Sequence, residues 1–292
     1  MPTRTLRTVT GRIAGRRQGT MVGCRSPYLS PPTWTDLAHP GRGRQPPHGA
    51  VIGRVLADEV PFVLVTGRPP RWVPRVAELA GVTGYAVCAN GAVLYDIAAD
   101  RVIGKHELAP VALHEYARAL TTAMPGCRLA TERVGATAMD GADEQFLAEP
   151  GYTHPWPNPD SAAAPRGEVL GKAAIKLLAR HPDMTSGQMA EAADAVLGNE
   201  VAVTYSSNNG LIEIAAAGVT KATGLAEVAE RLGVAAADVV AFGDMPNDVS
   251  MLSWAGHGVA MANAHPRAIA VADEVTGPNG EDGVALVLER WF

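Results

Sequence analysis

Residues 239–248 read Val-Val-Ala-Phe-Gly-Asp-Met-Pro-Asn-Asp, an apolar run followed by a glycine and a cluster of oxygen-bearing side chains. A short apolar run bounded by turn residues is typical of a strand buried on both faces of a parallel sheet. Asp244, Asn247 and Asp248 are spaced i, i+3 and i+4, so a helix that begins near Pro246 gathers their oxygens around one point. Two carboxylates this close repel each other unless a cation lies beside them, and Mg²⁺ accepts such oxygen ligands. The stretch therefore predicts a magnesium site, with ordinary helix capping as the alternative.

Two further predicted strands end in polar residues. Phe62–Val65 is a continuous apolar run that precedes a Thr-Gly-Arg turn, and Tyr85–Cys88 precedes an Asn-Gly turn. In an open α/β sheet, ligands bind outside the carboxyl ends of the strands, where hydroxyl and backbone N–H groups can receive a phosphate. For the first turn, a threonine helix cap followed by a proline is the alternative interpretation. The candidate residues for phosphate and substrate binding are Thr66, Gly67, Asn90 and Gly91.

Lys221 is a further candidate for phosphate binding because it begins a predicted helix over residues 221–232. A cation at a helix N-terminus is unfavourable with respect to the helix dipole, so a compensating anion is expected nearby. A lysine ammonium suits both the oxygens of a phosphate and the neighbouring carboxylate of Asp248. A solvated surface lysine is the alternative.

The order of predicted elements indicates an α/β protein with a doubly wound, parallel, Rossmann-like sheet. Residues 58–91 and 208–292 alternate short apolar strands with helices, and we assign them to the core of the fold. Residues 92–207 have fewer deeply apolar runs and an irregular stretch rich in proline and glycine. We therefore predict that they form an α+β domain inserted into the core.

Residues 1–57 differ from the remainder in composition. They contain nine arginines against the single acid Asp36, a charge of +8, which leaves −13 for the rest of the chain. Arginine, glycine and proline dominate, and no helical or strand periodicity persists, so this segment is expected to be disordered or foreign to the fold, with order beginning near Val51. A basic arm for nucleic acid or an organelle-targeting peptide is the functional alternative.

Composition limits the classes of function. No apolar stretch approaches the length of a membrane span, and the start of the chain lacks the apolar region of a secretory signal. Cys24, Cys88 and Cys127 form neither a disulfide framework nor a zinc site, so inert thiols and a cytoplasmic location are expected. The acidic body of the chain argues against nucleic acid and fits a small anionic substrate held at a metal site. Nothing in the sequence indicates an oligomeric state.

Taken in order, these motifs resemble those of the haloacid dehalogenase superfamily of phosphatases, over about residues 58–292. The insertion after the second strand is similar to the C2-type cap of the Cof-type subgroup. The resemblance implies a Mg²⁺-dependent phosphohydrolase in which an aspartate attacks phosphorus and the aspartyl-phosphate is then hydrolysed. Thr66 and Lys221 would act on the transferring group, and Asp244 would ligate Mg²⁺. Asn247 and Asp248 would complete or orient the metal site, and the substrate would be a small phosphorylated metabolite.

The chain departs from this family at the nucleophile. The aspartate should lie in a D-x-D-G-T-like motif that ends an apolar strand before Thr66, and no such motif is present. Asp36 follows no apolar strand, and Asp58 lies too close to Thr66. A displaced reading frame or a wrong start would explain residues 1–57. The alternative functions are a catalytically impaired or inactive protein that binds phosphate and metal, and a truncated product that folds poorly.

Overall fold

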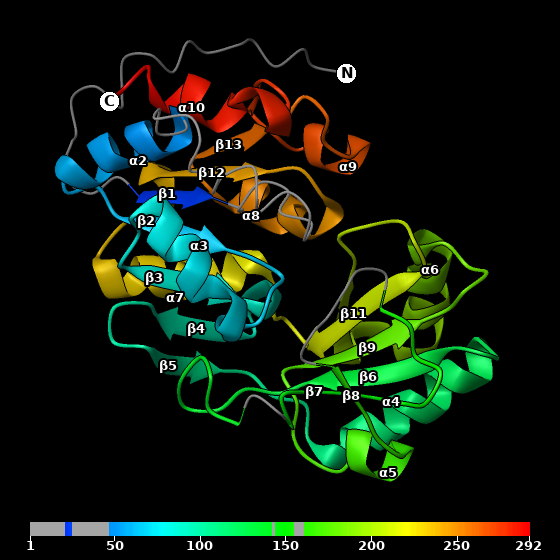
Figure 1. The fold of residues 1–292 in the computed structure, drawn as a ribbon. Helices are drawn as coiled ribbons and strands as arrows, with labels where there is room; N and C mark the ends of the chain where they lie inside the picture. Colours follow the sequence, from blue (N-terminus) through cyan, green and yellow to red (C-terminus); the bar gives the residue numbers. More distant parts are fainter. Residues whose placement is uncertain (1–20, 25–46, 142–143, 155–160) are drawn as a thin grey trace, which may run out of the picture.

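The computed structural model describes residues 21–24, 47–141, 144–154 and 161–292. Within these ranges the chain forms two sheets, each with its own helices (Figure 1). The larger sheet has the strand order β14-β13-β12-β1-β2-β3-β4-β5 and the smaller has the order β10-β11-β9-β6-β7-β8. This arrangement is the predicted α/β core with an inserted α+β cap.

The core sheet is parallel from β14 to β3, and the hairpin strands β4 and β5 add an antiparallel edge. Helices α10, α2 and α3 pack in series on one side of it, and α7 packs with α8 in another layer (Figure 1). The strands are β1 (Met21–Cys24), β2 (Phe62–Val65), β3 (Tyr85–Cys88), β4 (Val93–Asp96), β5 (Arg101–Lys105), β12 (Val239–Gly243), β13 (His257–Ala260) and β14 (Glu274–Val275). The helices are α2 (Pro47–Ala57), α3 (Val73–Ala80), α7 (Lys221–Leu232), α8 (Val249–Trp254), α9 (Pro266–Ile269) and α10 (Gly283–Leu288).

The cap sheet has one face against helices and the other toward the core. Strand β9 shows the alternation: Leu177 and Ala179 join the apolar cluster of the cap helices, whereas Lys176 lines the pocket on the core side. The strands are β6 (Arg128–Glu132), β7 (Phe146–Ala148), β8 (Ser161–Ala163), β9 (Lys176–Arg180), β10 (Val201–Thr204) and β11 (Leu211–Ala216). The helices are α4 (Pro110–Ala123), α5 (Arg166–Val169) and α6 (Ser186–Leu197).

The N-terminal segment requires a correction. Residues 21–24 form β1, which lies between β12 and β2 in the middle of the core sheet, and α2 begins at Pro47 rather than near Val51. Val51 and Val55 of α2 are 1% and 0% exposed. Burial of these side chains on the sheet stabilises a helix whose sequence shows only a short apolar face. These two parts of residues 1–57 therefore belong to the fold.

The boundaries between core and cap also differ from those expected, which lay between residues 91 and 92 and between residues 207 and 208. Strands β4 and β5, which were assigned to the inserted domain, extend the core sheet, because the Asn-Gly turn at residues 90–91 connects a hairpin from β3 to β4. Strand β11, which was assigned to the core, pairs with β10 and β9 in the cap sheet. The chain therefore enters the cap after β5 and leaves it after β11.

Glycine allows the N-terminus of α7 to approach the turn after β3. Gly91 has φ +105°, and a Cβ at this residue would lie 2.0 Å from the carbonyl oxygen of Thr220, the N-cap of α7. A Cβ at Gly224 would lie 2.9 Å from the Cα of Gly91. Both glycines are therefore needed for the close packing that places Lys221 beside this turn.

Gly91→Ala is expected to lower the free energy of unfolding by about 2 kcal/mol or more, because the new methyl group overlaps a backbone oxygen and φ is strained. Gly81→Ala is the matched control: its φ is +68° and a Cβ there meets no atom within 4 Å. Chemical denaturation of both variants measures the difference. Equal losses of stability would show that strain in φ alone, and not the contact with α7, requires glycine at residue 91.

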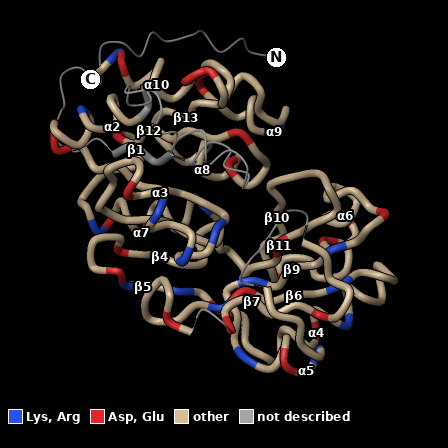
Figure 2. The backbone as a smooth tube through the Cα atoms, in the orientation of Figure 1, with Lys and Arg blue, Asp and Glu red and all other residues tan. Residues whose placement is uncertain are grey.

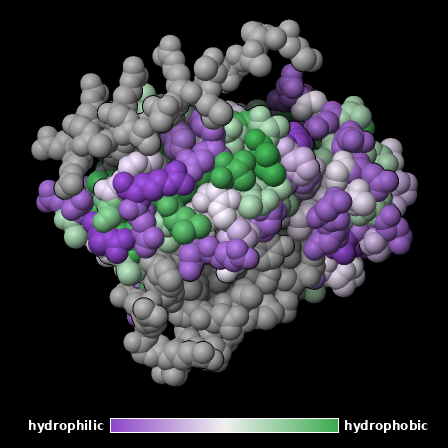
Figure 3. All heavy atoms as spheres, turned by 90° about the horizontal axis from the view of Figure 1, so that it is seen from above, coloured by the Kyte–Doolittle hydropathy of each residue, from purple (hydrophilic) through white to green (hydrophobic). Residues whose placement is uncertain are grey.

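Acidic and basic residues occur in both domains, and several basic positions lie in the part of the core that faces the cap (Figure 2). Exposed apolar side chains occur at the α9–β14–α10 end of the core, namely Ile269, Val275 and Leu286. The view onto this end shows apolar surface among polar residues (Figure 3). Among the described residues, no helix is both long and apolar enough to cross a membrane.

Candidate active site

Three strands of the core sheet end at one edge, and their following turns are joined by hydrogen bonds. The backbone N–H of Thr66, after β2, donates to the carbonyl of Val87 at 2.8 Å. The N–H of Asn90, after β3, donates to the carbonyl of Thr66 at 3.0 Å, and the Asn247 side chain after β12 donates to the Asn90 amide oxygen at 3.0 Å. The structure therefore brings the candidate residues from β2, β3 and β12 into one continuous network.

Asp248 organises the turn after β12. Its Oδ2 accepts hydrogen bonds from the backbone N–H groups of Asp244 and Met245 at 3.0 and 2.9 Å. A Cβ at Gly243 would lie 2.5 Å from the Cβ of Asp248, so this turn requires glycine. The 3₁₀ turn η7 (Pro246–Asp248) precedes α8, so helical geometry begins at Pro246, the start that the gathering of these oxygens required. Asp248 thus shapes the loop on which Asp244 and Asn247 lie.

Lys221 is the partner of Asp248. Its Nζ lies 2.5 Å from Asp248 Oδ1, and both side chains are 0% exposed. Thr220 caps α7 through a reciprocal pair of hydrogen bonds with Thr223, so Lys221 is the first residue of the helix as predicted. The carboxylate supplies the compensating anion that the helix dipole requires, and the interpretation as a surface lysine is wrong.

The residues of the predicted metal site fit Mg²⁺ by the chemistry of their donor atoms. Asp244 is 4% exposed, and its Oδ2 accepts a hydrogen bond from Asn279 at 2.9 Å. The amide oxygen of Asn247 is buried without a hydrogen-bond partner among the described residues. Such a buried oxygen carries a desolvation cost unless a ligand satisfies it, and a hard cation would do so. Within the described ranges, no group of three His, Cys, Asp or Glu side chains forms a ready metal cage.

The loop after β2 does not form the helix cap that was the alternative interpretation of this turn. The Thr66 hydroxyl accepts a hydrogen bond from the N–H of Arg68 at 3.1 Å, and the first helical turn begins only at Pro70. Thr66 therefore closes a tight turn and does not cap a helix. A Cβ at Gly67 would lie 2.9 Å from the Asn90 amide oxygen, so glycine allows this loop to pack on Asn90.

A pocket of about 240 Å³ lies between the core and the cap. Asn90, Lys221 and Asn247 line it from the core, and Lys176 of β9 and Glu213 of β11 line it from the cap. Lys176 Nζ donates to the carbonyl of Gly67 at 2.6 Å and to Glu213 Oε1 at 2.7 Å. The cap therefore contacts the same loop that carries Thr66.

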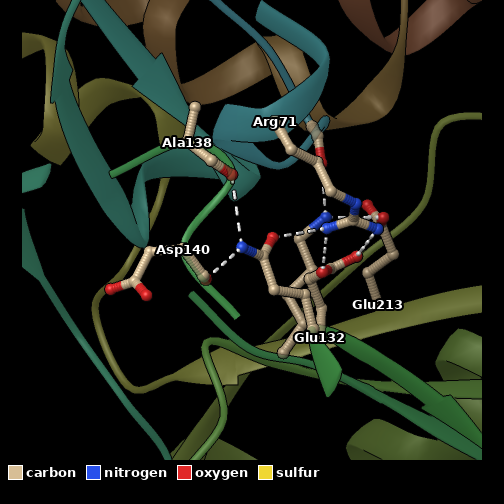
Figure 4. A network of polar contacts seen from close by, with 8 residues as sticks. Arg71, Glu132, Ala138, Asp140 and Glu213 are labelled. Atoms are coloured by element: carbon tan, nitrogen blue, oxygen red, sulfur yellow. Dashed lines mark hydrogen bonds and ion pairs between the residues drawn. The ribbon is translucent and has the colours of Figure 1, made fainter. Parts of the chain in front are cut away.

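A second polar contact joins the two domains beside the pocket (Figure 4). The guanidinium of Arg71, just after the Thr66 loop, forms an ion pair with Glu132 of β6 at 2.5 Å and donates to the side chain of Gln145 at 3.2 Å. The side chains of Arg71 and Glu132 are 1% and 7% exposed. In Figure 4, Glu132 and Glu213 point from the cap strands toward the same cluster. This buried ion pair joins the cap to the core.

Aromatic residues extend this face of the cap. The rings of Tyr152 and His154 lie 6.0 and 5.6 Å from that of Phe146, and burial lowers the pKa of His154 to about 4. The imidazole is therefore neutral at neutral pH. Burial likewise raises the pKa of the Cys88 thiol, so this cysteine at the end of β3 is an unreactive thiol.

The candidate residues predicted from the sequence did not include Arg71, Glu132, Lys176 and Glu213. One signal was available for Glu213, because it is a charged residue in a strand that is otherwise apolar. The contacts of Lys176 with Gly67 and of Glu213 with Asn90 depend on the position of the cap relative to the core, which no local sequence pattern predicts.

The end of β1 is the place where the family resemblance expects the nucleophile. Cys24 pairs in register with Phe242 of β12 and Leu64 of β2, which precede Asp244 and Thr66 by two residues each. The strand reads Met-Val-Gly-Cys and contains no carboxylate. Asp36 lies outside the described residues, and Asp58 precedes β2, at the edge of the sheet opposite the candidate site.

The chain belongs to a family of haloacid dehalogenase-like hydrolases, whose model matches residues 46–288. It is 45% identical over 92 residues to a 5-amino-6-(5-phospho-D-ribitylamino)uracil phosphatase of Bacillus subtilis, which is 32% of this chain and 36% of that protein. It is 49% identical over 74 residues to a phosphoglycolate phosphatase of Natronomonas pharaonis, which is 25% of this chain and 33% of that protein. The chain thus spans about a third of the length of these curated relatives.

Solved structures share the fold over nearly the whole chain. A phosphatase of the haloalkanoate (HAD) enzyme superfamily from Bacteroides thetaiotaomicron has a TM-score of 0.73 at 19% identity and covers 95% of this chain and 96% of its own. A subclass IIB sugar phosphatase has a TM-score of 0.71 at 19% identity, with 93% and 98% covered. Both the Rossmann-like core and the cap predicted from the sequence are therefore confirmed.

Proposed function

We propose that the protein is a Mg²⁺-dependent phosphohydrolase that acts on a small phosphorylated metabolite enclosed between core and cap. The observation that carries this proposal is the continuous contact network from the Thr66 loop through Asn90 to Asn247, beside the buried Lys221–Asp248 pair. Phosphoryl transfer depends mainly on positioning and charge stabilisation, and this network gathers the groups that do both.

Each candidate residue has a role in this proposal. Asp244 would hold Mg²⁺ together with the buried amide oxygen of Asn247, which has no hydrogen-bond partner among the described residues. The ion supplies positive charge to the phosphoryl oxygens when bound. The Thr66 hydroxyl and the Gly67 loop would receive the phosphoryl group, and Lys221 would stabilise its charge from the N-terminus of α7. Asn90 and Gly91 would line the substrate side of the same site, and Asp248 orients the metal loop and Lys221.

The family resemblance implies attack by an aspartate and an aspartyl-phosphate intermediate. Because β1 contains no carboxylate, we assign no residue of this chain to that attack. The relatives named for phosphoribitylaminouracil and phosphoglycolate support a small phosphorylated substrate, and the free buried thiols of Cys88 and Cys127 support a cytoplasmic location.

The test is hydrolysis of p-nitrophenyl phosphate by the purified 292-residue protein, with Mg²⁺ and after its removal by EDTA. Turnover that is lost with EDTA and regained with Mg²⁺ is the expected result. Binding of Mg²⁺ or inorganic phosphate, measured by calorimetry, without turnover would favour the alternative of an inactive binding protein. A folded protein that neither binds these ions nor turns over the ester would contradict both.

A further inference from the structure

A chain of four polar side chains leads from the cap to the candidate metal loop. Lys176 donates to Glu213 Oε1 at 2.7 Å, and Glu213 Oε2 accepts from the Asn90 amide nitrogen at 2.7 Å. The Asn90 amide oxygen accepts from the Asn247 amide nitrogen at 3.0 Å. The Asn247 amide oxygen is then left buried without a partner among the described residues.

Glu213 determines the direction of every bond in this chain of contacts. An ionised carboxylate only accepts hydrogen bonds, whereas an amide presents a donor on one side and an acceptor on the other. Asn90 must therefore turn its nitrogen toward Glu213, so that its oxygen faces Asn247. Asn247 must in turn donate its nitrogen to Asn90, and its oxygen is the atom that remains. Only this orientation of the two amides satisfies all the contacts.

From this order of donors and acceptors we infer that Glu213 is a positioning residue of the cap. Through Asn90 it keeps the oxygen of Asn247 available as a metal ligand. The inference rests on the metal-dependent function proposed above. It also links cap position to the metal loop, because Lys176 holds Glu213 and contacts the Gly67 carbonyl of the core at 2.6 Å. A cap moved away from the core would take with it the carboxylate that orients both amides.

Glu213→Gln reverses the order of donors and acceptors along this chain of contacts and preserves the size of the side chain. Lys176 donates only, so it keeps the oxygen of the new amide, and the amide nitrogen then faces Asn90. Asn90 must flip to present its oxygen, its nitrogen then faces Asn247, and Asn247 must flip as well. The site would then present an N–H group in place of the ligand oxygen. We expect Mg²⁺ affinity to fall about 10–100-fold, the usual effect of losing an outer-shell partner.

Adding Asn90→Asp to the Glu213→Gln variant should restore the order of donors and acceptors. The amide introduced by Glu213→Gln would donate to one oxygen of the new carboxylate, and the other oxygen would accept from Asn247 as in the wild type. The double variant Asn90→Asp/Glu213→Gln has the wild-type net charge and is expected to recover most of the lost Mg²⁺ affinity. Asn90→Asp alone sets two carboxylates against each other and is expected not to bind Mg²⁺ more tightly than the double variant.

Two measurements on the full chain test the inference. In metal-free protein with ¹⁵N-labelled asparagine, the side-chain amide resonance of Asn247, assigned by its loss in Asn247→Asp, should shift in Glu213→Gln and return toward its original position in the double variant. In calorimetric titrations, the affinity for Mg²⁺ should likewise fall in Glu213→Gln and recover in the double variant. Glu144→Gln is the control, because this cap glutamate pairs with Lys172 at a side chain that is 65% exposed.

An unchanged Asn247 resonance or an unchanged Mg²⁺ affinity in Glu213→Gln would overturn the inference. So would a folded double variant that recovers neither, because Glu213 would then act only as the ion-pair partner of Lys176. Wild-type protein without measurable Mg²⁺ binding would overturn the metal-ligand role of Asn247. Failure of the proposed phosphatase activity is separate: it would appear as absent turnover in a protein whose amide resonances and Mg²⁺ affinity still depend on Glu213.

Discussion

Asp244→Asn is expected to reduce Mg²⁺-dependent phosphate-ester hydrolysis by about 10²-fold or more, comparable with the loss of one preorganised group that stabilises transition-state charge. Asn279 donates to Asp244 Oδ2 at 2.9 Å, and an amide oxygen can still accept this hydrogen bond. The substitution therefore removes the charge with little change in shape. The carboxylate lies at the end of β12 and is 4% exposed. Steady-state rates over a Mg²⁺ series measure the effect.

Asp238→Asn is the matched control for this experiment. Asp238 lies immediately before β12, at the opposite end of the strand from Asp244, so the same chemical change is made at the far edge of the sheet. Its turnover is expected to equal that of the wild type. If Asp244→Asn instead keeps wild-type turnover with an unchanged Mg²⁺ requirement, the metal is not held at the end of β12.

The best sequence predictions were those in which local pattern and long-range packing require the same structure. Residues 221–232 were predicted as a helix and form α7 over that range, because Thr220 and Thr223 cap its start and its apolar positions face the sheet. The apolar run at residues 239–242 was predicted as a buried strand, and β12 is buried at every position. In both elements the propensity, the turn chemistry and the burial agree.

Strand β1 shows what the sequence could not indicate. Its four residues include a glycine and a cysteine and stand in an arginine-rich segment, so they show no strand period. Their place is set by parallel pairing with β12 and β2, which are separated from them by long stretches of chain. Central parallel strands depend on such non-local pairing, and composition over a window cannot reveal it.

The cap contacts illustrate a second limit. Strand β11 is followed directly by α7 of the core, and its assignment to the cap depends on pairing with β9 and β10. Its Glu213 has the appearance of a solvent-facing residue in an amphipathic strand, yet it meets Asn90 of the core. The sequence therefore indicated the loop after β12 and Lys221 as candidates for the site, whereas the cap side of the pocket required the relative placement of two domains.

Lys221→Met is expected to lower the free energy of unfolding by about 3–5 kcal/mol, because it removes the cation that faces the buried carboxylate of Asp248. The pair is 0% exposed on both sides, so water cannot compensate the carboxylate in the folded protein. A methionine side chain has nearly the length of lysine, which limits any cavity. Thermal and urea denaturation measure the loss of stability.

The double variant Lys221→Met/Asp248→Asn separates the contribution of Lys221 to stability from its contribution to hydrolysis. The new amide oxygen can still accept from the N–H groups of Asp244 and Met245, as Asp248 Oδ2 does, so the metal loop keeps its shape. With both charges of the pair removed from the core, most of the lost stability should return. Hydrolysis should remain at least about 10²-fold below wild type, since the cation at the start of α7 that would stabilise the phosphoryl group is gone. Recovery of both stability and turnover would mean that Lys221 serves only to neutralise Asp248, and the phosphate site would have to be sought among Arg68, Arg71 and Lys176 instead.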